Sequence, residues 1–297
     1  KRAGSLRFLG YGAESEFFVR LPPLHLPTMM NYFVRTPMLR RTPMLRAAVS
    51  TTTTVKNNTS TQPSPTRPTT SPLLDLSDIT RAQFRIRDHV VHTPFEKSLR
   101  LSELFDCEIY TKLEFRQATG SFKERGAANV ILQLDGEQRK KGVVAASAGN
   151  HALALARHGP RSGVPVTVVM PVIAPLTKVS NCRSMGARVL LAGNHLLEAR
   201  DIADDLRQKE GLTYVNGYDD LAILAGQGTV GLEMLNQVSN LDAIIVTIGG
   251  GGLIAGVALA VKSINSKCQV IGVEPERCAS WSAAVKAGKP VPVNSLA

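Results

Sequence analysis

Lys123 is the residue whose surroundings in the sequence best suit covalent chemistry. It lies within Thr119–Gly126, where Gly120 and Ser121 precede it and Phe122 is its direct neighbour. An apolar wall and a helix N-terminus both disfavour the ammonium form, and the neutral amine is the form that attacks a carbonyl carbon. Most lysines are solvated surface charges, so it is this setting, at an expected loop-to-helix junction, that indicates Schiff-base chemistry.

A run of glycines forms a second candidate ligand site. It consists of Gly249, Gly250, Gly251 and Gly252. The run follows the apolar segment Ala243–Ile248 and precedes a helical pattern that begins near Leu253. Glycines at such a junction let backbone N–H groups approach an anion, while the helix N-terminus supplies positive partial charge. Because a tight turn alone needs fewer glycines, we expect anion binding.

The glycine run by itself leaves the identity of the anion open. Gly250, Gly252 and Ala255 fit the dinucleotide-binding fingerprint in its G/A form, and Glu274 follows where that fingerprint has an acidic residue. A nicotinamide-dependent oxidoreductase is therefore an alternative to an enzyme that binds another phosphorylated cofactor. Lys123 favours the second interpretation, because hydride transfer from a nicotinamide needs no such lysine.

A short loop between an expected strand and an expected helix is the third signal. It consists of Ser147, Ala148, Gly149, Asn150 and His151. Capping of the following helix is one role for Ser147 or Asn150. Binding of a substrate carboxylate by the same exposed amides is another role, and the spacing alone does not separate the two.

The elements that must position these signals follow from the apolar pattern. Beyond Asp75, short β-branched runs alternate with helical patterns, which indicates parallel strands joined by helical crossovers. The expected strands are Glu108–Leu113, Val143–Ala146, Val166–Met170, Arg188–Leu191, Thr213–Val215, Ala243–Ile248 and Val270–Val273. The expected helices lie around Phe122–Leu134, His151–His158, Leu176–Met185, Leu196–Gln208, Ile223–Gln237 and Leu253–Ile264. In such a doubly wound α/β fold, ligands bind at the carboxyl ends of the strands.

Composition places the chain among soluble globular proteins. Its 297 residues can bury one or two cores, 43% of them are apolar, and the mean hydropathy is −0.01. No apolar run approaches the roughly 20 residues that span a bilayer. The four cysteines show no CxxC pairing and resemble reduced core residues of an intracellular protein, which argues against a zinc site.

The basic charge of the chain is concentrated in residues 1–74. This segment holds 10 Lys and Arg against 2 acids, and the remainder holds 25 against 22, which argues against a nucleic-acid or membrane surface. It is rich in Ser, Thr, Pro and Arg, so we expect residues 1–74 to be disordered. An acid-poor N-terminus is typical of organelle transit peptides, which would imply a mitochondrial or other organelle matrix. The alternative is that the leader is non-native and that translation starts at Met29 or Met30, in which case the protein would be cytoplasmic.

Together the motifs resemble those of the threonine dehydratase (threonine ammonia-lyase) and serine racemase family, which are pyridoxal-phosphate enzymes of the second fold type. The resemblance covers residues 75–297, and Lys112–Glu114, Gly226–Thr229 and Gly272–Pro275 extend it. It implies two open doubly wound α/β domains of the tryptophan-synthase-beta type. Residues 75–144 and 218–297 would form a large cofactor-binding domain, and residues 145–217 would form a small domain.

The resemblance also implies a role for each signal. Lys123 would bind the aldehyde of pyridoxal 5'-phosphate, Phe122 would pack beside its ring, and Asn150 would hydrogen-bond the ring hydroxyl. The amides of Gly249–Gly252 and of Leu253 would bind the phosphate. The loop of Ser147, Ala148, Gly149, Asn150 and His151 would bind the substrate carboxylate.

The chain departs from the family pattern at three places. Serine racemases carry a serine, their reprotonating acid, where this chain has Ala148, and a methyl group cannot donate a proton. Their divalent-cation site pairs the glutamate that matches Glu274 with a downstream aspartate, where this chain has Ser280, so no metal is expected. The residue that the family places opposite the pyridine nitrogen would lie beyond Ala297, so the C-terminal part of the fold is expected to be missing.

We therefore expect a pyridoxal-phosphate-dependent ammonia-lyase that converts L-threonine to 2-oxobutanoate and ammonia, and also L-serine to pyruvate. Lys123, once freed from the cofactor, would remove the substrate Cα proton as a general base. A serine racemase, a nicotinamide-dependent oxidoreductase and a non-catalytic truncated chain are the alternatives. The resemblance implies a homo-oligomer with a small amino-acid substrate, and neither a nucleic acid nor a membrane is an expected partner.

Overall fold

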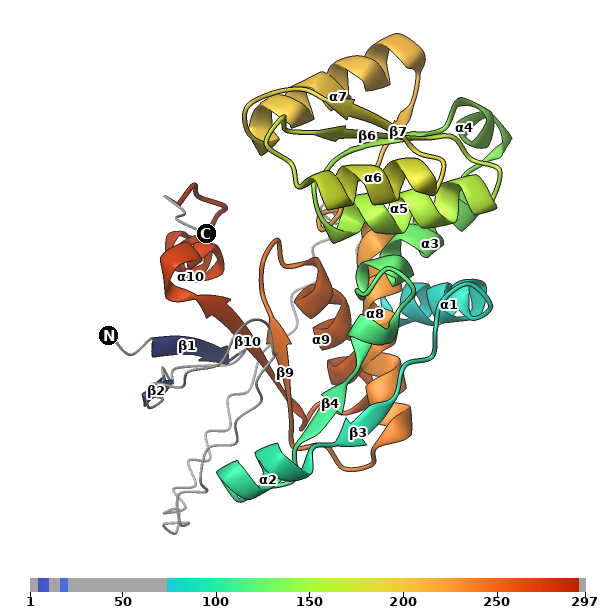
Figure 1. Cartoon of the computed structure of the whole chain (residues 1–297). Coiled ribbons are helices and arrows are strands. Elements are labelled where there is room, and N and C mark those ends of the chain that lie inside the picture. Colours follow the sequence, from blue (N-terminus) through green and yellow to red (C-terminus); the bar gives the residue numbers. More distant parts are fainter. Residues whose placement is uncertain (1–4, 11–16, 21–73, 294–297) are drawn as a thin grey trace, which may run out of the picture. The chain divides into compact units, whose positions relative to one another are not determined.

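The computed structural model describes residues 5–10, 17–20 and 74–293 (Figure 1). Of the two units into which the chain divides, the first contains all of these described residues. All helices and strands named below belong to the first unit. Among the described helices, none combines the length and the apolarity needed to cross a bilayer.

One sheet consists of four parallel strands in the order β7-β6-β5-β8. Its strands are β5 (Val143–Ala146), β6 (Val166–Met170), β7 (Arg188–Leu191) and β8 (Thr213–Tyr214). Strands β5 and β6 are almost wholly buried, as expected of strands that are covered on both faces. These strands, apart from the length of β8, lie where the β-branched runs predict them.

Different helices cover the two faces of this sheet, with α7 on one side and α5 and α6 on the other (Figure 1). The helices are α5 (Asn150–Arg161), α6 (Leu176–Ser184) and α7 (Leu196–Glu210). Along β5, Val143 and Ala145 pack with residues of α5 and α6, whereas Val144 packs with residues of α7. This alternation follows from the two-residue period of a strand, and it produces a doubly wound sheet.

The second sheet has the order β2-β1-β10-β9. It consists of β1 (Ser5–Gly10), β2 (Phe17–Arg20), β9 (Ala243–Thr247) and β10 (Gln269–Pro275). Strands β9 and β10 are parallel, and β1 pairs antiparallel with both β10 and β2. Helices α8 (Leu221–Gln237) and α9 (Gly252–Ile264) pack against β9 and β10 through a shared apolar core.

The remaining elements lie before β5 and after β10. They are α1 (Leu76–Ile86), β3 (Phe95–Lys97), α2 (Leu99–Phe105), β4 (Tyr110–Lys112), η1 (Glu114–Arg116), α3 (Lys123–Gln133), α4 (Gly136–Lys141), η2 (Glu276–Cys278) and α10 (Ser280–Ala287). Strands β3 and β4 pair antiparallel with each other in a sheet of their own. Helix α3 packs against both α5, which covers the parallel sheet, and α8, which packs against β9 and β10.

The α/β fold class is confirmed, and the six predicted helices are present as α3, α5, α6, α7, α8 and α9, with ends shifted by a few residues, whereas α4 was not predicted. One strand assignment needs correction, because β4 does not join a parallel sheet but pairs antiparallel with β3, which was not predicted. The side chains of β4 are only half-buried, and its sequence Tyr110-Thr111-Lys112 lacks the continuous Val/Ile run that is typical of a buried parallel strand. The division into a large and a small domain remains a prediction.

The expected disorder of residues 1–74 also remains a prediction. Strands β1 and β2 fall inside that segment, and backbone hydrogen bonds pair β1 with β10. Apart from these two strands and Leu74, the segment lies outside the described residues, as does the proposed start at Met29 or Met30.

A buried ion-pair network holds α3 against α8 near the Lys123 motif. The Arg125 side chain is fully buried and donates to both carboxylate oxygens of Glu114, at 2.8 and 2.7 Å, and of Glu233, at 2.6 and 2.8 Å. Lys112 Nζ donates to Glu233 at 2.6 Å. Burial tends to lower the pKa of Arg125, but its hydrogen bonds to the two carboxylates outweigh burial and raise the pKa. Two cations and two anions therefore balance inside the core.

Candidate active site

Lys123 is the first residue of α3, and its side chain is half-buried. The helix has no side-chain cap, but Ser121 Oγ accepts a hydrogen bond from the Lys123 N–H at 3.2 Å. Lys123 Nζ donates to the carbonyl oxygen of Gly217, and it lies 5.4 Å from the centroid of the Phe122 ring. Burial lowers the pKa of Lys123 to about 8, so about a tenth of the amine is neutral at pH 7.

The segment Val215–Tyr218, which follows β8, connects all three sequence signals. Gly217 accepts the hydrogen bond from Lys123, and a Cβ atom added at Gly217 would lie 2.8 Å from the His151 ring. Tyr218 packs against the glycine run, because a Cβ added at Gly250 would lie 2.2 Å from its ring. The tertiary structure thus places the lysine, the Asn150 loop and the glycine run around one short segment.

The glycine run forms the turn between β9 and α9, as predicted. Gly251 is the N-cap of α9 and has φ +85°, a left-handed conformation that glycine adopts without strain. A Cβ added at Gly252 would lie 2.6 Å from the backbone oxygen of Tyr218, so only glycine fits there. Because α9 has no side-chain cap, the amides of Gly252 and Leu253, in its first turn, have no acceptor within the helix. Such a helix end can bind an anion.

The loop from Ser147 to His151 forms the turn between β5 and α5. The N-cap of α5 is Gly149, without a side-chain cap, and Ser147 Oγ accepts instead from the Gly149 N–H at 3.3 Å. The capping role considered for Ser147 or Asn150 is therefore wrong, because neither side chain reaches an amide of the first turn. The half-buried Ala148 packs against the core of the parallel sheet.

Asn150 and His151 point in different directions. Asn150 is exposed, and its Oδ1 accepts a hydrogen bond from Lys178 Nζ of α6 at 3.1 Å. His151 is 7% exposed, and its Nε2 lies 3.0 Å from the carbonyl oxygen of Val215. Since a carbonyl only accepts, Nε2 carries the proton. Burial lowers the pKa of His151 to about 4, with the Lys123 charge as a smaller contribution, so the ring is neutral and Nδ1 is an unpaired acceptor.

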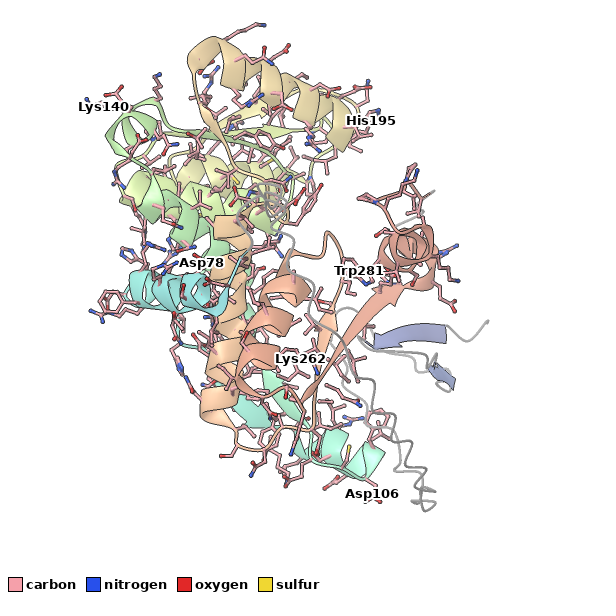
Figure 2. All side chains as sticks on the ribbon, turned by 180° about the vertical axis from the view of Figure 1, so that it is seen from behind. Asp78, Asp106, Lys140, His195, Lys262 and Trp281 are labelled. Atoms are coloured by element: carbon pink, nitrogen blue, oxygen red, sulfur yellow. The ribbon has the colours of Figure 1, made fainter. Side chains whose placement is uncertain are left out.

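Glu274 has a structural role in this fold. Its carboxylate accepts from the Trp281 N–H at 2.9 Å and from the Ser282 N–H at 2.8 Å, both in the first turn of α10. Trp281, labelled in Figure 2, lies against Gly251, since a Cβ added there would be 3.2 Å from its ring. Ser280 opens the helix, and no group of three or more metal-ligating side chains occurs among the described residues.

Three residues of the site were missed in the sequence. Gly217 and Tyr218 come from a stretch between strand and helix, where Asn216 Oδ1 accepts from the Tyr218 N–H at 3.1 Å. The Asn-Gly pair is a turn signal that could have marked this segment, although not its neighbours. Lys178 carries no signal, because it is one of several cations on helical patterns.

The residues present fit a phosphorylated aldehyde. They include a half-buried lysine whose pKa is lowered, and two helix N-termini without side-chain caps, each close to the segment Val215–Tyr218. A Cβ added at Gly149 or at Gly249 would meet no atom within 4 Å, so there is open space at both turns. Phe122, half-buried in the core below α9, offers an apolar ring beside the amine.

Comparison with known proteins bears on this geometry. A profile of the family described as pyridoxal-phosphate dependent enzymes matches residues 86–296. Over 217 residues the chain is 44% identical to an L-threonine ammonia-lyase of Thermotoga maritima, and the match covers 73% of this chain and 54% of that protein. The chain thus spans about half the length of this curated relative.

Solved structures show the same likeness. The processed form of threonine deaminase isoform 2 from Solanum lycopersicum has a TM-score of 0.72 at 37% identity, covering 75% of this chain and 64% of that chain. Maize serine racemase has a TM-score of 0.73 at 36% identity, covering 75% of this chain and 68% of that chain.

Proposed function

The chain belongs to the pyridoxal-phosphate dependent enzyme family, and from this membership we propose that it acts as an ammonia-lyase on L-threonine and L-serine. The products would be 2-oxobutanoate and pyruvate, each with ammonia. Similarity to an L-threonine ammonia-lyase and to a threonine deaminase supports this choice within the family. The resemblance drawn from the motifs is confirmed at the level of family and cofactor, and the nicotinamide-dependent alternative is wrong because the matched family uses pyridoxal phosphate.

Lys123 is the proposed catalytic residue. Its amine, with a pKa lowered by burial to about 8, would bind the cofactor aldehyde and would later remove the proton from the substrate Cα. When bound, pyridoxal phosphate supplies an electron sink for the charge that develops at Cα. The hydrogen bond that Lys123 Nζ donates to the carbonyl oxygen of Gly217 would orient the amine.

The two helix N-termini are the proposed anion sites. The amides of the glycine loop Gly249–Gly251 and those of Gly252 and Leu253, in the first turn of α9, would hold the cofactor phosphate. The first-turn amides of α5, with the loop from Ser147 to His151, would hold the substrate carboxylate. Asn150 would turn its exposed amide toward the cofactor ring hydroxyl, and Phe122 would pack beside the ring.

One observation carries the proposal: the half-buried side chain of Lys123 donates to a segment that also contacts the His151 loop and the glycine run. The test is borohydride reduction of the cofactor-loaded chain, followed by peptide mass mapping. We expect the adduct on Lys123 and none in the Lys123→Ala variant, which should also lose the visible cofactor band and turnover. Lys140→Ala is the matched control, since Lys140 is exposed on α4. An adduct on any other residue would refute the proposal.

A serine racemase is the second candidate, supported by the similarity to maize serine racemase. The methyl group of Ala148 argues against it, because it offers no proton for the face of Cα opposite Lys123. Chiral analysis of serine after prolonged incubation separates the two reactions, since only a racemase would produce D-serine.

Assembly and location are part of the same proposal. We propose a homo-oligomer, which light scattering of the purified chain would test. We also propose that residues 145–217 form a small domain and that residues 75–144 and 218–297 form a large one. We also propose that residues 1–74 act as an organelle transit peptide. A fluorescent protein fused to residues 1–74 should then enter an organelle, whereas a cytoplasmic distribution would contradict this.

A further inference from the structure

Glu124, the residue after Lys123, has a buried carboxylate that none of the roles above uses. Its side chain is 1% exposed, and it lies in the buried part of α3, which extends from Glu124 to Ile131. Glu124 Oε1 accepts a hydrogen bond from the backbone N–H of Thr119 at 2.9 Å. The carboxylate therefore closes the loop Thr119–Lys123 back onto the start of the helix.

The other carboxylate oxygen reaches α5. Glu124 Oε2 lies 2.7 Å from His158 Nε2 and 3.3 Å from Arg157 Nε, and the Arg157 contact is too poorly aligned for a hydrogen bond. Burial tends to raise the pKa of Glu124, but hydrogen bonds from His158 and Thr119 outweigh it, so the pKa is lowered. The carboxylate is therefore ionised and can only accept, which places the proton of His158 on Nε2.

His158 and Asn150 are on the same helix. Helix α5 spans Asn150–Arg161, and its central residues Ala152–Ala156 are buried. A buried helix of this length moves as one body, so a tie at His158 fixes the position of its first turn as well. The two hydrogen bonds of Glu124 thus connect the Lys123 loop with the helix that begins at Asn150.

An ionised carboxylate in the core is costly unless hydrogen bonds compensate for the lost solvation. An apolar residue of similar volume could pack in the same place without that cost. A role beyond packing is therefore indicated. We propose that Glu124 is a positioning residue, which holds the Lys123 loop through Thr119 and fixes its distance from the Asn150 end of α5 through His158. This inference rests on the proposed function, because it concerns the spacing of two residues assigned to the cofactor.

The first test measures the Lys123 amine without cofactor. Acetic anhydride labelling of the chain over a range of pH, with peptide mass spectrometry, gives the pH midpoint at which Lys123 reacts. In the unmodified chain we expect a midpoint near pH 8. In Glu124→Leu the released loop lets water reach the amine, and the midpoint should rise by about one unit or more. Glu124→Gln keeps an oxygen for Thr119 and should fall between the two.

The second test measures the tie to α5. The dissociation constant of pyridoxal phosphate, read from its visible absorbance, is compared for Asn150→Ala in the unmodified chain and in His158→Leu. We expect Asn150→Ala to weaken binding about tenfold in the unmodified chain and less than about threefold in His158→Leu, since Asn150 is then already displaced. His158→Gln keeps a donor at the same place and should restore the tenfold effect.

Val144→Ala is the control for a general loss of stability, because it removes buried volume on the α7 face of the parallel sheet, away from Glu124. It should change neither the labelling midpoint nor the effect of Asn150→Ala. The proposal is overturned if the midpoint in both Glu124 variants stays at that of the unmodified chain, or if Asn150→Ala costs the same with and without His158. The labelling uses no cofactor, so it decides this point even where borohydride finds no adduct on Lys123.

Discussion

Removal of Arg125 should destabilise the protein more than any loss of a surface charge. Its guanidinium is fully buried and binds the carboxylates of Glu114 and Glu233, whose side chains are 13% and 6% exposed. Lys112, 4% exposed, is the second cation of the group. In Arg125→Met, one buried ammonium would face two buried carboxylates, so one negative charge would be uncompensated. Breaking a buried pair in this way costs about 3–5 kcal/mol.

The assay is urea unfolding followed by far-ultraviolet circular dichroism. With a slope of about 3 kcal/mol per M urea, that loss lowers the midpoint by about 1–1.7 M. Arg125→Lys keeps the charge but loses the planar fork that spans both carboxylates, so we expect an intermediate midpoint. The shift should persist in 0.5 M NaCl, because salt screens buried charges weakly.

A compensating variant sharpens the experiment. Arg125→Met combined with Glu114→Gln restores the charge balance, and it should recover part of the loss, giving a positive coupling energy. If Arg125→Met lowers the midpoint by less than about 0.3 M, or if Glu114→Gln makes the double variant worse, the reasoning about an uncompensated buried charge is refuted.

Three further predictions concern the site. The rate at which pyridoxal phosphate attaches to the empty chain should rise with pH and level off above pH 8, because burial lowers the pKa of Lys123 to about 8 and only the neutral amine reacts; a rise that continues to pH 10 would contradict this. Gly252→Ala should lower the free energy of unfolding by about 1–3 kcal/mol, because the added Cβ would meet the backbone of Tyr218. Gly249→Ala should change this free energy little, because there is open space around Gly249. Equal melting temperatures of the two variants would contradict this packing. Ala148→Ser should introduce a proton donor and produce D-serine from L-serine, which chiral chromatography would detect and the unmodified chain should lack.

The parallel sheet could be predicted because its buried strands coincide with short apolar runs in the sequence. Val143–Ala146 is a continuous apolar run and Val166–Met170 is one apart from Thr167, and the structure has β5 and β6 with the same ends. Strand β3 spans only Phe95–Lys97 and has no such run, because Glu96 and Lys97 are exposed. Pairing between short, half-exposed strands depends on tertiary context and not on local pattern.

The sequence by itself determined the three signals of the site, their order and the family to which they point, because glycine runs and a lysine beside a helix start are local features. Only the tertiary structure decided what lies between them. The contact of Lys123 with Gly217 joins residues 94 positions apart, and that of Glu124 with His158 joins residues 34 positions apart. A hydrogen bond across such a separation is formed by packing of whole helices, and the residue types at its two ends do not specify each other.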